Sequence, residues 1–376
     1  MRATVLPVSG GSFAAQLGLL QLMLESGLEE PELVLAASGG GVAAYAALCG
    51  EWTSPGISRV AGSLHNSLFA RRWLSSSPLS CAVGFFEGTF YREGEGLENV
   101  LRTYLNRESA TRSEIWLSTC NIRRHKASLF CNLGPDESQL KEIEYLDESL
   151  TQCLPPVYLG GNLSAIARAI LASASIPTVV PPQIIEGEPH VDGGLYYASP
   201  LAPLQPVLAE QAGDEPLHLL YVNGCDLERG VSFLSKPARC DREGAVVDRS
   251  NLLDNGFLAA GGLVRGQLLA DRLAGCQLVR GQGGGFHSAL FHGTPENLEL
   301  LEDFWAAASR SMVEVFPRAS PETDALAGGS YAPPSVDITN FSGRDVLRVM
   351  EEARRSATLR LCWKGEEDLP GELGFY

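Results

Sequence analysis

A serine interrupts an apolar run and is followed at once by three glycines, and this stretch constrains the fold more than any other. Residues 33–37 are all Leu, Val or Ala, Ser38 follows them, and the residues after the glycines favour a helix. The pattern predicts a buried strand, a sharp turn with Ser38 at its tip, and a helix starting directly behind it. Such a turn presents the serine hydroxyl together with the free N–H groups of the helix.

The residues before this stretch predict a second unit of the same kind. Residues 3–8 read as a strand, Ser9-Gly10-Gly11-Ser12 as a loop, and the segment from Phe13 to Gly27 as a helix. Two strand–helix units in fifty residues predict parallel, neighbouring strands whose loops lie at the same edge of a sheet. The amides of the loop would then converge on the Ser38 hydroxyl, as acyl transfer requires. A phosphate-binding loop is the alternative, but its usual glycine spacings are absent.

A second informative segment covers residues 162–200. Asn162 or Ser164 is expected to cap a helix, and residues 184–185 and 190–191 read as the strands of a tight hairpin. Asp192 ends the second strand and is followed by Gly193 and Gly194. An aspartate at this place is suited to act as a base, although the same pattern also describes an aspartate that caps a turn.

Together these pieces resemble the patatin-like phospholipases. The family has a Gly-rich loop, a G-x-S-x-G turn, an Ala-Ser segment followed by paired prolines, and an Asp-Gly-Gly or Asp-Gly-Ala motif. Here the corresponding residues are Ser9-Gly10-Gly11-Ser12, Ala36-Ala37-Ser38-Gly39-Gly40, Ala174-Ser175-Ile176-Pro177 with Pro181-Pro182, and Asp192-Gly193-Gly194. They occur in the family's order and cover roughly the first 225 residues.

The resemblance implies a three-layer α/β/α fold with a mostly parallel central sheet. It also implies a catalytic dyad in which Ser38 is the nucleophile, Asp192 its base, and the amides of Gly10, Gly11 and Ser12 the oxyanion hole. The implied reaction is hydrolysis of carboxylic esters of phospholipids or other acyl lipids, without metal or cofactor. The implied partners are a lipid substrate and, transiently, a membrane surface.

The chain departs from the family pattern at several positions. Ser12 replaces a glycine, Ala14 an arginine, and Ala36 the first glycine of the turn, while residues 198–200 (Ala-Ser-Pro) replace a segment with asparagine. A backbone donor does not depend on its side chain, so Ser12 can still serve. The loss of the arginine bears on how the loop is anchored.

Two other functions compete with the dyad. An α/β-hydrolase triad would need a histidine after the aspartate, and His218, His287 and His292 are the candidates. In the α/β-hydrolase fold, however, the nucleophile comes later in the chain, whereas Ser38 already follows the second expected strand. A lipid-binding or assembly module that keeps the fold without catalysis is the other rival, and the altered loop favours it.

The remaining residues indicate how the chain is divided into a core, an insertion and a C-terminal region, and they suggest little about the reaction. We expect a catalytic core over residues 1–225, with a cap-like, aromatic-rich insertion around 52–160 and a basic turn at 123–126. We expect residues 226–254 to form a mobile excursion from the core, that is, a long loop suited to act as a lid. The rest of 226–376 reads as mainly helical, with helices near 252–273, 294–312 and 344–355. Whether it completes the first domain or forms a partner surface is left open by the sequence.

Composition excludes several function classes. The formal net charge of −16 argues against nucleic acid and against simple electrostatic adhesion to anionic membranes. The nine cysteines include no C-x-x-C pair, which favours reduced, buried thiols over a zinc site or a disulfide framework. The N-terminal residues do not form a signal-peptide core, and no apolar run reaches membrane-spanning length. We therefore expect a cytoplasmic protein.

Overall fold

The computed structural model describes most of the predicted core. Its described residues are 1–64, 103–104, 106–140, 153–177, 180–227, 252–281, 286–318 and 343–364. The aromatic part of the expected cap and most of the excursion expected over 226–254 lie outside these ranges.

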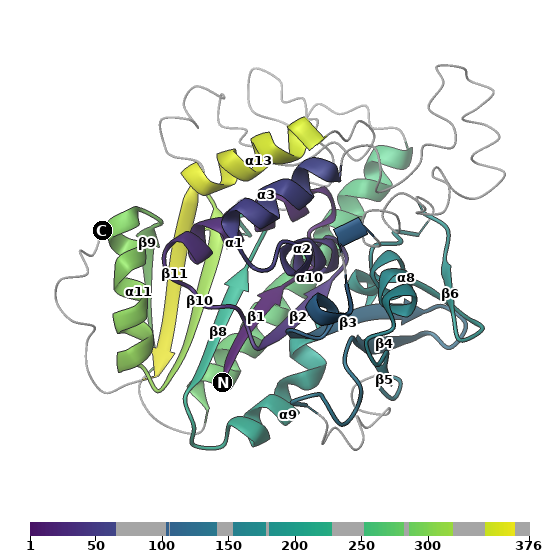
Figure 1. Ribbon diagram of the computed structural model, residues 1–376, viewed down its shortest axis with the longest axis horizontal. Coiled ribbons are helices and arrows are strands. Elements are labelled where there is room, and N and C mark those ends of the chain that lie inside the picture. Colours follow the sequence, from purple (N-terminus) through teal and green to yellow (C-terminus); the bar gives the residue numbers. More distant parts are fainter. Residues whose placement is uncertain are drawn as a thin grey trace.

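An 11-stranded mixed sheet forms the centre of the molecule (Figure 1). Its five middle strands are parallel, in the order β3-β2-β1-β8-β10, with antiparallel strands on both sides. The strands are β1 (Arg2–Leu6), β2 (Leu33–Ala37), β3 (Glu114–Asn121), β4 (Lys126–Cys131), β5 (Val157–Tyr158), β6 (Gln183–Ile185), β7 (Glu188–Asp192), β8 (Leu217–Val222), β9 (Phe286–His292), β10 (Arg310–Pro317) and β11 (Ala357–Lys364). The parallel neighbours β1 and β2 confirm the expectation from their strand–helix units.

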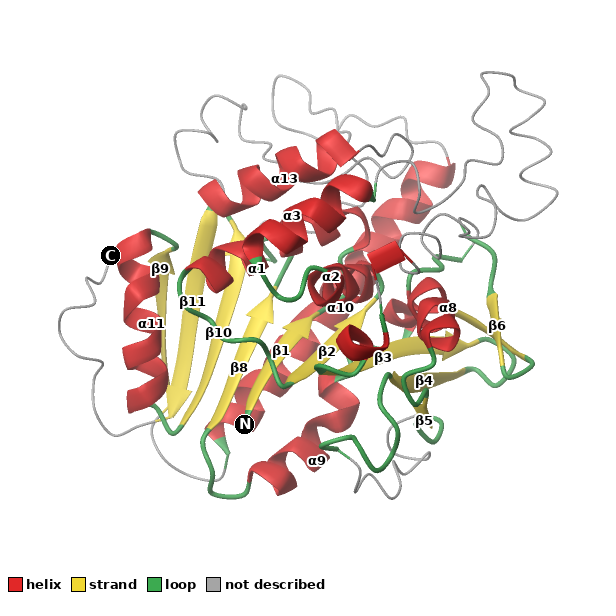
Figure 2. Cartoon of the chain, viewed as in Figure 1, coloured by secondary structure: helices red, strands yellow, loops and turns green. Residues whose placement is uncertain are grey.

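Helices cover both faces of this sheet (Figure 2). One face carries α1 (Phe13–Glu25), α2 (Gly39–Cys49), α3 (Ser54–Ser63), the short α6 (Arg107–Ala110), α8 (Leu163–Ser173), α11 (Pro295–Ala307) and α13 (Gly343–Arg355); the other carries α9 (Leu201–Ala212) and α10 (Leu252–Arg280). In β2, Val34 and Ala36 face the first layer, while Leu33 and Leu35 face the second. Because alternate side chains of a strand point to opposite faces, an all-apolar strand is buried on both. The three-layer α/β/α arrangement is confirmed.

The described part of the region after residue 225 contains strands in addition to the expected helices. It contributes α10, α11 and α13, but also β9, β10 and β11, which extend the sheet beyond β8. Met312, which we placed on one long helix face starting at Thr294, lies in β10, because α11 ends at Ala307. Since β8 pairs in parallel with β10, one continuous sheet contains residues from both sides of the predicted boundary.

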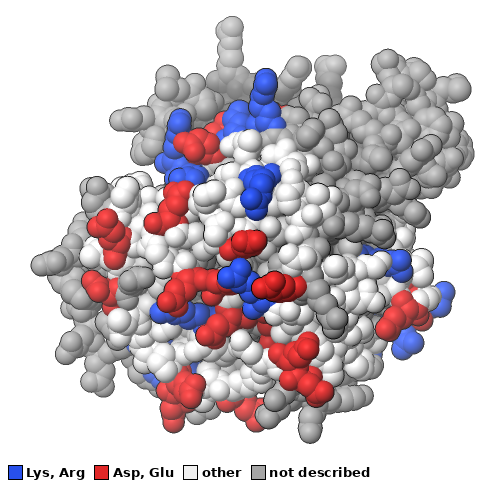
Figure 3. All heavy atoms as spheres, in the orientation of Figure 1, with Lys and Arg blue, Asp and Glu red and all other residues white. Residues whose placement is uncertain are grey.

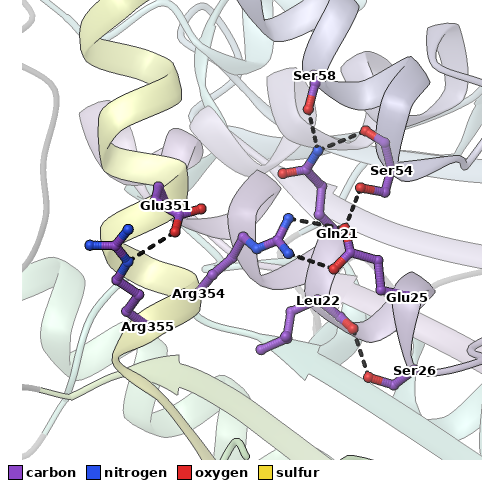
Figure 4. A network of polar contacts seen from close by, with 9 residues as sticks. All are labelled: Gln21, Leu22, Glu25, Ser26, Ser54, Ser58, Glu351, Arg354 and Arg355. Carbon is purple, nitrogen blue, oxygen red and sulfur yellow. Dashed lines mark hydrogen bonds and ion pairs between the residues drawn. The ribbon is translucent and has the colours of Figure 1, made fainter. Parts of the chain in front are cut away.

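Polar contacts fasten the second half of α1 to two other helices (Figure 4). The Gln21 amide donates 2.7 Å hydrogen bonds to the carbonyl oxygen of Ser54 and to the Ser58 hydroxyl, both in α3. Glu25 accepts a 2.6 Å hydrogen bond from the Ser54 hydroxyl and pairs with Arg354 of α13. The helix that follows the Gly-rich loop is therefore held in place at its far end.

Candidate active site

Ser38 occupies the turn between β2 and α2 in a strained conformation. Its φ of 54° and ψ of −129° are rarely adopted by a residue with a side chain. The two residues that follow must be small, because a Cβ on Gly39 would collide with the carbonyl oxygen of Gly10, and one on Gly40 with that of Leu6. The turn predicted from the serine and the glycines is therefore present, packed directly against the loop after β1.

Asp192 lies in hydrogen-bonding contact with this serine. The Ser38 hydroxyl donates a 2.6 Å hydrogen bond to Oδ2 of Asp192, across 154 positions of sequence. The sheet brings them together: β7 pairs antiparallel with β3, with Asp192 opposite Thr119, while β3 lies beside β2. The other carboxylate oxygen, Oδ1, accepts a 2.8 Å hydrogen bond from the Gly194 amide, which leaves Oδ2 for the serine.

Two further serines support this pair from the end of α8. The Ser173 hydroxyl accepts a 2.9 Å hydrogen bond from the Ser38 amide and donates one of 2.8 Å to the Ser118 carbonyl oxygen. The Ser175 carbonyl oxygen accepts from the Asp192 amide at 3.0 Å. We had singled out Ser175 but not Ser173. Residues 172–177 have the spacing A-S-x-x-x-P with Ser173 as its serine. This spacing is the sequence signal that could have identified Ser173.

Burial controls the acidity of the carboxyl group. Both members of the pair are buried, and burial raises the pKa of Asp192 from 3.8 to about 6, against the opposing effect of its hydrogen bonds from Ser38 and Gly194. No Lys or Arg in the described part of the chain forms an ion pair with Asp192. A carboxylate with a raised pKa is a stronger base, and it is still mostly ionised at neutral pH.

The loop after β1 presents two amides beside the serine. Gly10 has a φ of 51°, which glycine tolerates, and the loop continues as a single 3₁₀ turn over Gly10–Ser12. The Ser12 amide donates to the Ser9 carbonyl oxygen at 2.9 Å, so the third donor that the resemblance implied is already engaged. The amides of Gly10 and Gly11 donate to no acceptor among the described residues. Neither amide is therefore committed to a partner within the described part of the chain.

The candidate histidines of a triad lie elsewhere in the sheet. His218 is paired with Arg2 at the amino ends of β8 and β1, the edge opposite Ser38, and contacts the Ser311 hydroxyl at 2.8 Å. His287 and His292 belong to β9, which is separated from β2 by β1, β8, β10 and β11. At about 4.8 Å per strand, this is a lateral distance of roughly 24 Å. The described geometry therefore brings Ser38 and Asp192 together and leaves the three candidate histidines apart from them.

The basic turn at residues 123–126 joins β3 to β4. Arg123 and Arg124 lie 3.5 and 3.8 Å from the same oxygen of Glu188, and their side chains are largely exposed. On the face shown in Figure 3, basic side chains lie among acidic ones rather than in a continuous patch of the described surface. Glu188 thus offsets part of the positive charge of this turn.

The described residues form neither a metal site nor a membrane-spanning helix. No group of three or more His, Cys, Asp or Glu is arranged there to hold a metal ion. No helix in the same part of the chain has the length and apolar character needed to cross a membrane.

Comparison with known proteins supports one family. The family model for patatin-like phospholipases matches residues 8–204, which is more than half of the chain. The match includes the Gly-rich loop, Ser38 and Asp192. No curated protein matched the sequence.

Proposed function

Because this chain belongs to the patatin-like phospholipase family, we propose that it hydrolyses carboxylic esters of phospholipids or other acyl lipids. Members of the family are generally lipid acyl hydrolases. In this proposal Ser38 is the nucleophile, Asp192 its base, and the amides of Gly10 and Gly11 the oxyanion hole. The observation that carries the proposal is the 2.6 Å hydrogen bond from the Ser38 hydroxyl to Asp192.

The proposed reaction has two steps. Ser38 Oγ attacks the ester carbonyl carbon while its proton moves to Oδ2 of Asp192, and the carbonyl oxygen becomes an oxyanion that accepts from the loop amides. The intermediate collapses, the C–O bond to the alcohol breaks, and Asp192 returns the proton to the departing oxygen. Water then attacks the acyl-enzyme with Asp192 again as base, which releases the fatty acid and restores the Ser38 hydroxyl.

The surroundings of Asp192 suit this role without a histidine. A free aspartate is too weak a base for an alcohol, but burial raises the pKa of this one to about 6. The Gly194 amide fixes the carboxylate from the other side, so the proton acceptor points at the serine. The strained backbone of Ser38 in turn fixes the hydroxyl, so the two reacting groups are aligned before substrate binds.

The substrate would be taken from a lipid surface by transient contact. The net charge of −16 disfavours electrostatic attraction to anionic lipids, so we assign this contact to apolar groups. Zwitterionic and neutral lipids are then expected to be better substrates than anionic ones.

A lipid panel tests the proposal. Phospholipids, lysophospholipids and acylglycerols are incubated with the protein, and released fatty acids are measured by mass spectrometry with Ser38→Ala as the blank. We expect release by the unaltered protein only, together with labelling of Ser38 by a fluorophosphonate probe. Equal release by Ser38→Ala would refute the assigned nucleophile. Neither release nor labelling by the unaltered protein would favour a lipid-binding module instead.

A further inference from the structure

A buried glutamine contacts the Gly-rich loop from α1. Gln16 is fully buried, and its side-chain amide makes three hydrogen bonds. Its Oε1 accepts from the Ser9 hydroxyl at 2.7 Å, and its Nε2 donates to the carbonyl oxygens of Pro7 at 2.9 Å and Val222 at 3.1 Å. Both hydrogens of Nε2 and one lone pair of Oε1 therefore have partners within the protein.

These partners come from different parts of the sheet edge. Pro7 and Ser9 lie between β1 and the 3₁₀ turn, while Val222 is the last residue of β8. Gln16 thus ties the start of the loop to the carboxyl end of a neighbouring strand. The far side of the loop is confined too, because a Cβ on Gly224 would lie 2.8 Å from the Ser12 carbonyl oxygen.

We propose that Gln16 is the positioning residue of the oxyanion loop, holding the amides of Gly10 and Gly11 where the negative charge develops. This inference rests on the proposed function. Donors of this kind accelerate a reaction only when they are aligned in advance, and a loop with two consecutive glycines has little stiffness of its own. The resemblance places an arginine at the position of Ala14, and Ala14 has no polar group to anchor the loop. Gln16, two residues later in the same helix, supplies three anchoring bonds.

Gln21 provides a matched control. It is a second buried glutamine of α1, and both hydrogens of its side-chain nitrogen are also engaged, but with Ser54 and Ser58 of α3 (Figure 4). Replacing either glutamine by methionine keeps the length of the side chain and removes its hydrogen bonds. The two variants therefore differ mainly in whether the loop loses its anchor.

The experiment measures ester hydrolysis by Gln16→Met and Gln21→Met, with the folded enzyme counted by active-site labelling. We expect kcat of Gln16→Met to fall about 10- to 100-fold with KM nearly unchanged, since misplaced donors weaken binding of the transition state more than of the substrate. Gln21→Met should keep kcat within about twofold, since side chains outside a site that acts as a unit do not contribute to its rate.

A thionoester substrate gives a second readout that a purely structural role would not move. Sulfur is a weaker hydrogen-bond acceptor than oxygen, so an intact oxyanion hole favours the oxygen ester over its thiono analogue. The ratio of the two rates should fall toward one in Gln16→Met and stay at the unaltered value in Gln21→Met. Equal losses of kcat in both variants, with unchanged ratios, would overturn the proposal.

A second variant covers a failure of Gln16→Met to fold. Ser9→Ala removes the bond that Gln16 accepts from Ser9 and keeps those that it donates to Pro7 and Val222. We therefore expect kcat to fall about 3- to 10-fold, less than in the glutamine variant. No loss of kcat in Ser9→Ala would then overturn the proposal.

The anchoring role is also testable if the unaltered protein hydrolyses no ester. In that case the proposed function fails, and hydrogen exchange of the peptide covering residues 7–13 tests the anchor alone. Faster exchange in Gln16→Met but not in Gln21→Met would support it, and equal exchange in both would overturn it.

Discussion

The described residues include two buried Ser–Asp pairs, and we propose a catalytic role for only one of them. The Ser38 hydroxyl lies 2.6 Å from Asp192, and the Ser199 hydroxyl lies 2.7 Å from Asp271. All four residues are buried, and burial raises the pKa of Asp192 to about 6 and that of Asp271 to about 7. By distance, burial and acidity alone the two pairs are nearly equivalent.

Their surroundings separate them. The Ser199 hydroxyl also accepts a 3.0 Å hydrogen bond from the Leu201 amide at the start of α9, and the Tyr221 hydroxyl shares the Asp271 oxygen at 3.1 Å. Asp271 belongs to α10, so this pair joins α9, β8 and α10. Ser38, by contrast, sits on a strained turn beside a loop with two unengaged amides. The Ser38 pair therefore has two features that set it apart from the Ser199 pair: a strained turn that carries the hydroxyl, and neighbouring amides that we propose as donors for the oxyanion.

The largest expected difference comes from removing each hydroxyl. Ser38→Ala should lower the rate of ester hydrolysis at least about 10³-fold, because the acyl-enzyme has no attachment site. Ser199→Ala should stay within about threefold for the folded protein. Initial rates on a lipid ester and fluorophosphonate labelling measure both. A large loss of rate in folded Ser199→Ala would contradict the comparison.

Neutralising each carboxylate should give the next largest difference. Asp192→Asn should lower kcat about 10²- to 10⁴-fold, because an amide cannot take the serine proton. Asp271→Asn should leave kcat nearly unchanged. Circular dichroism of both variants shows whether the fold persists. Full activity in Asp192→Asn would mean that another group acts as the base.

The pH dependence of kcat/KM sharpens the assignment further. The base works ionised, and its pKa is raised to about 6, so activity should be lost as the pH falls through 6. A single group of this kind gives about a tenfold rise between pH 5 and pH 7. The midpoint should be the same in Asp271→Asn. A shifted midpoint in Asp271→Asn would show that Asp271 contributes to the titration and that its assignment to Asp192 is wrong.

The smallest expected effect is on stability, where the two pairs should behave alike. Each folded-state pKa lies above the ordinary aspartate value of 3.8, so the folded protein holds the proton more tightly than the unfolded chain. The associated stability is present below about pH 4 and is lost as the pH rises through 6 for Asp192 and 7 for Asp271. Asn at either position should therefore raise the free energy of unfolding relative to the unaltered protein by about 2–4 kcal/mol more at pH 8 than at pH 4. Urea unfolding at both values measures this difference, and an effect confined to one position would show that the pairs differ in the folded state as well.

Local patterns predicted the part of the site that local structure builds. The turn at Ser38 and the loop at Gly10 follow from apolar runs broken by glycines, so their place at one sheet edge was predictable. The contact with Asp192 depends on β7 adding to β3, which no local pattern encodes, and it came from the resemblance. The engagement of the Ser12 amide is a detail of three-dimensional packing that the sequence pattern did not show, whereas Ser173 stands in a segment whose spacing could have identified it.

The strand β10 was missed for a physical reason. Glu314 interrupts the apolar pattern of β10, and a charged residue usually marks a surface position. In the structure Glu314 is buried, and its carboxylate lies 2.6 Å from the guanidinium of Arg360 in β11 and 3.6 Å from that of Arg272 in α10. The charge is tolerated because its partners come from elements far along the chain.

The position of β11 has a consequence for synthesis of the protein on the ribosome. This strand lies between β10 and β9 in the sheet, although it is made after both. Until it emerges, β9 has no strand to pair with and the eight residues of β10 present an open edge. Such an edge invites pairing with a strand of another nascent chain. Translation halted just before Ala357 should therefore release chains that aggregate, whereas chains that include β11 close the edge themselves.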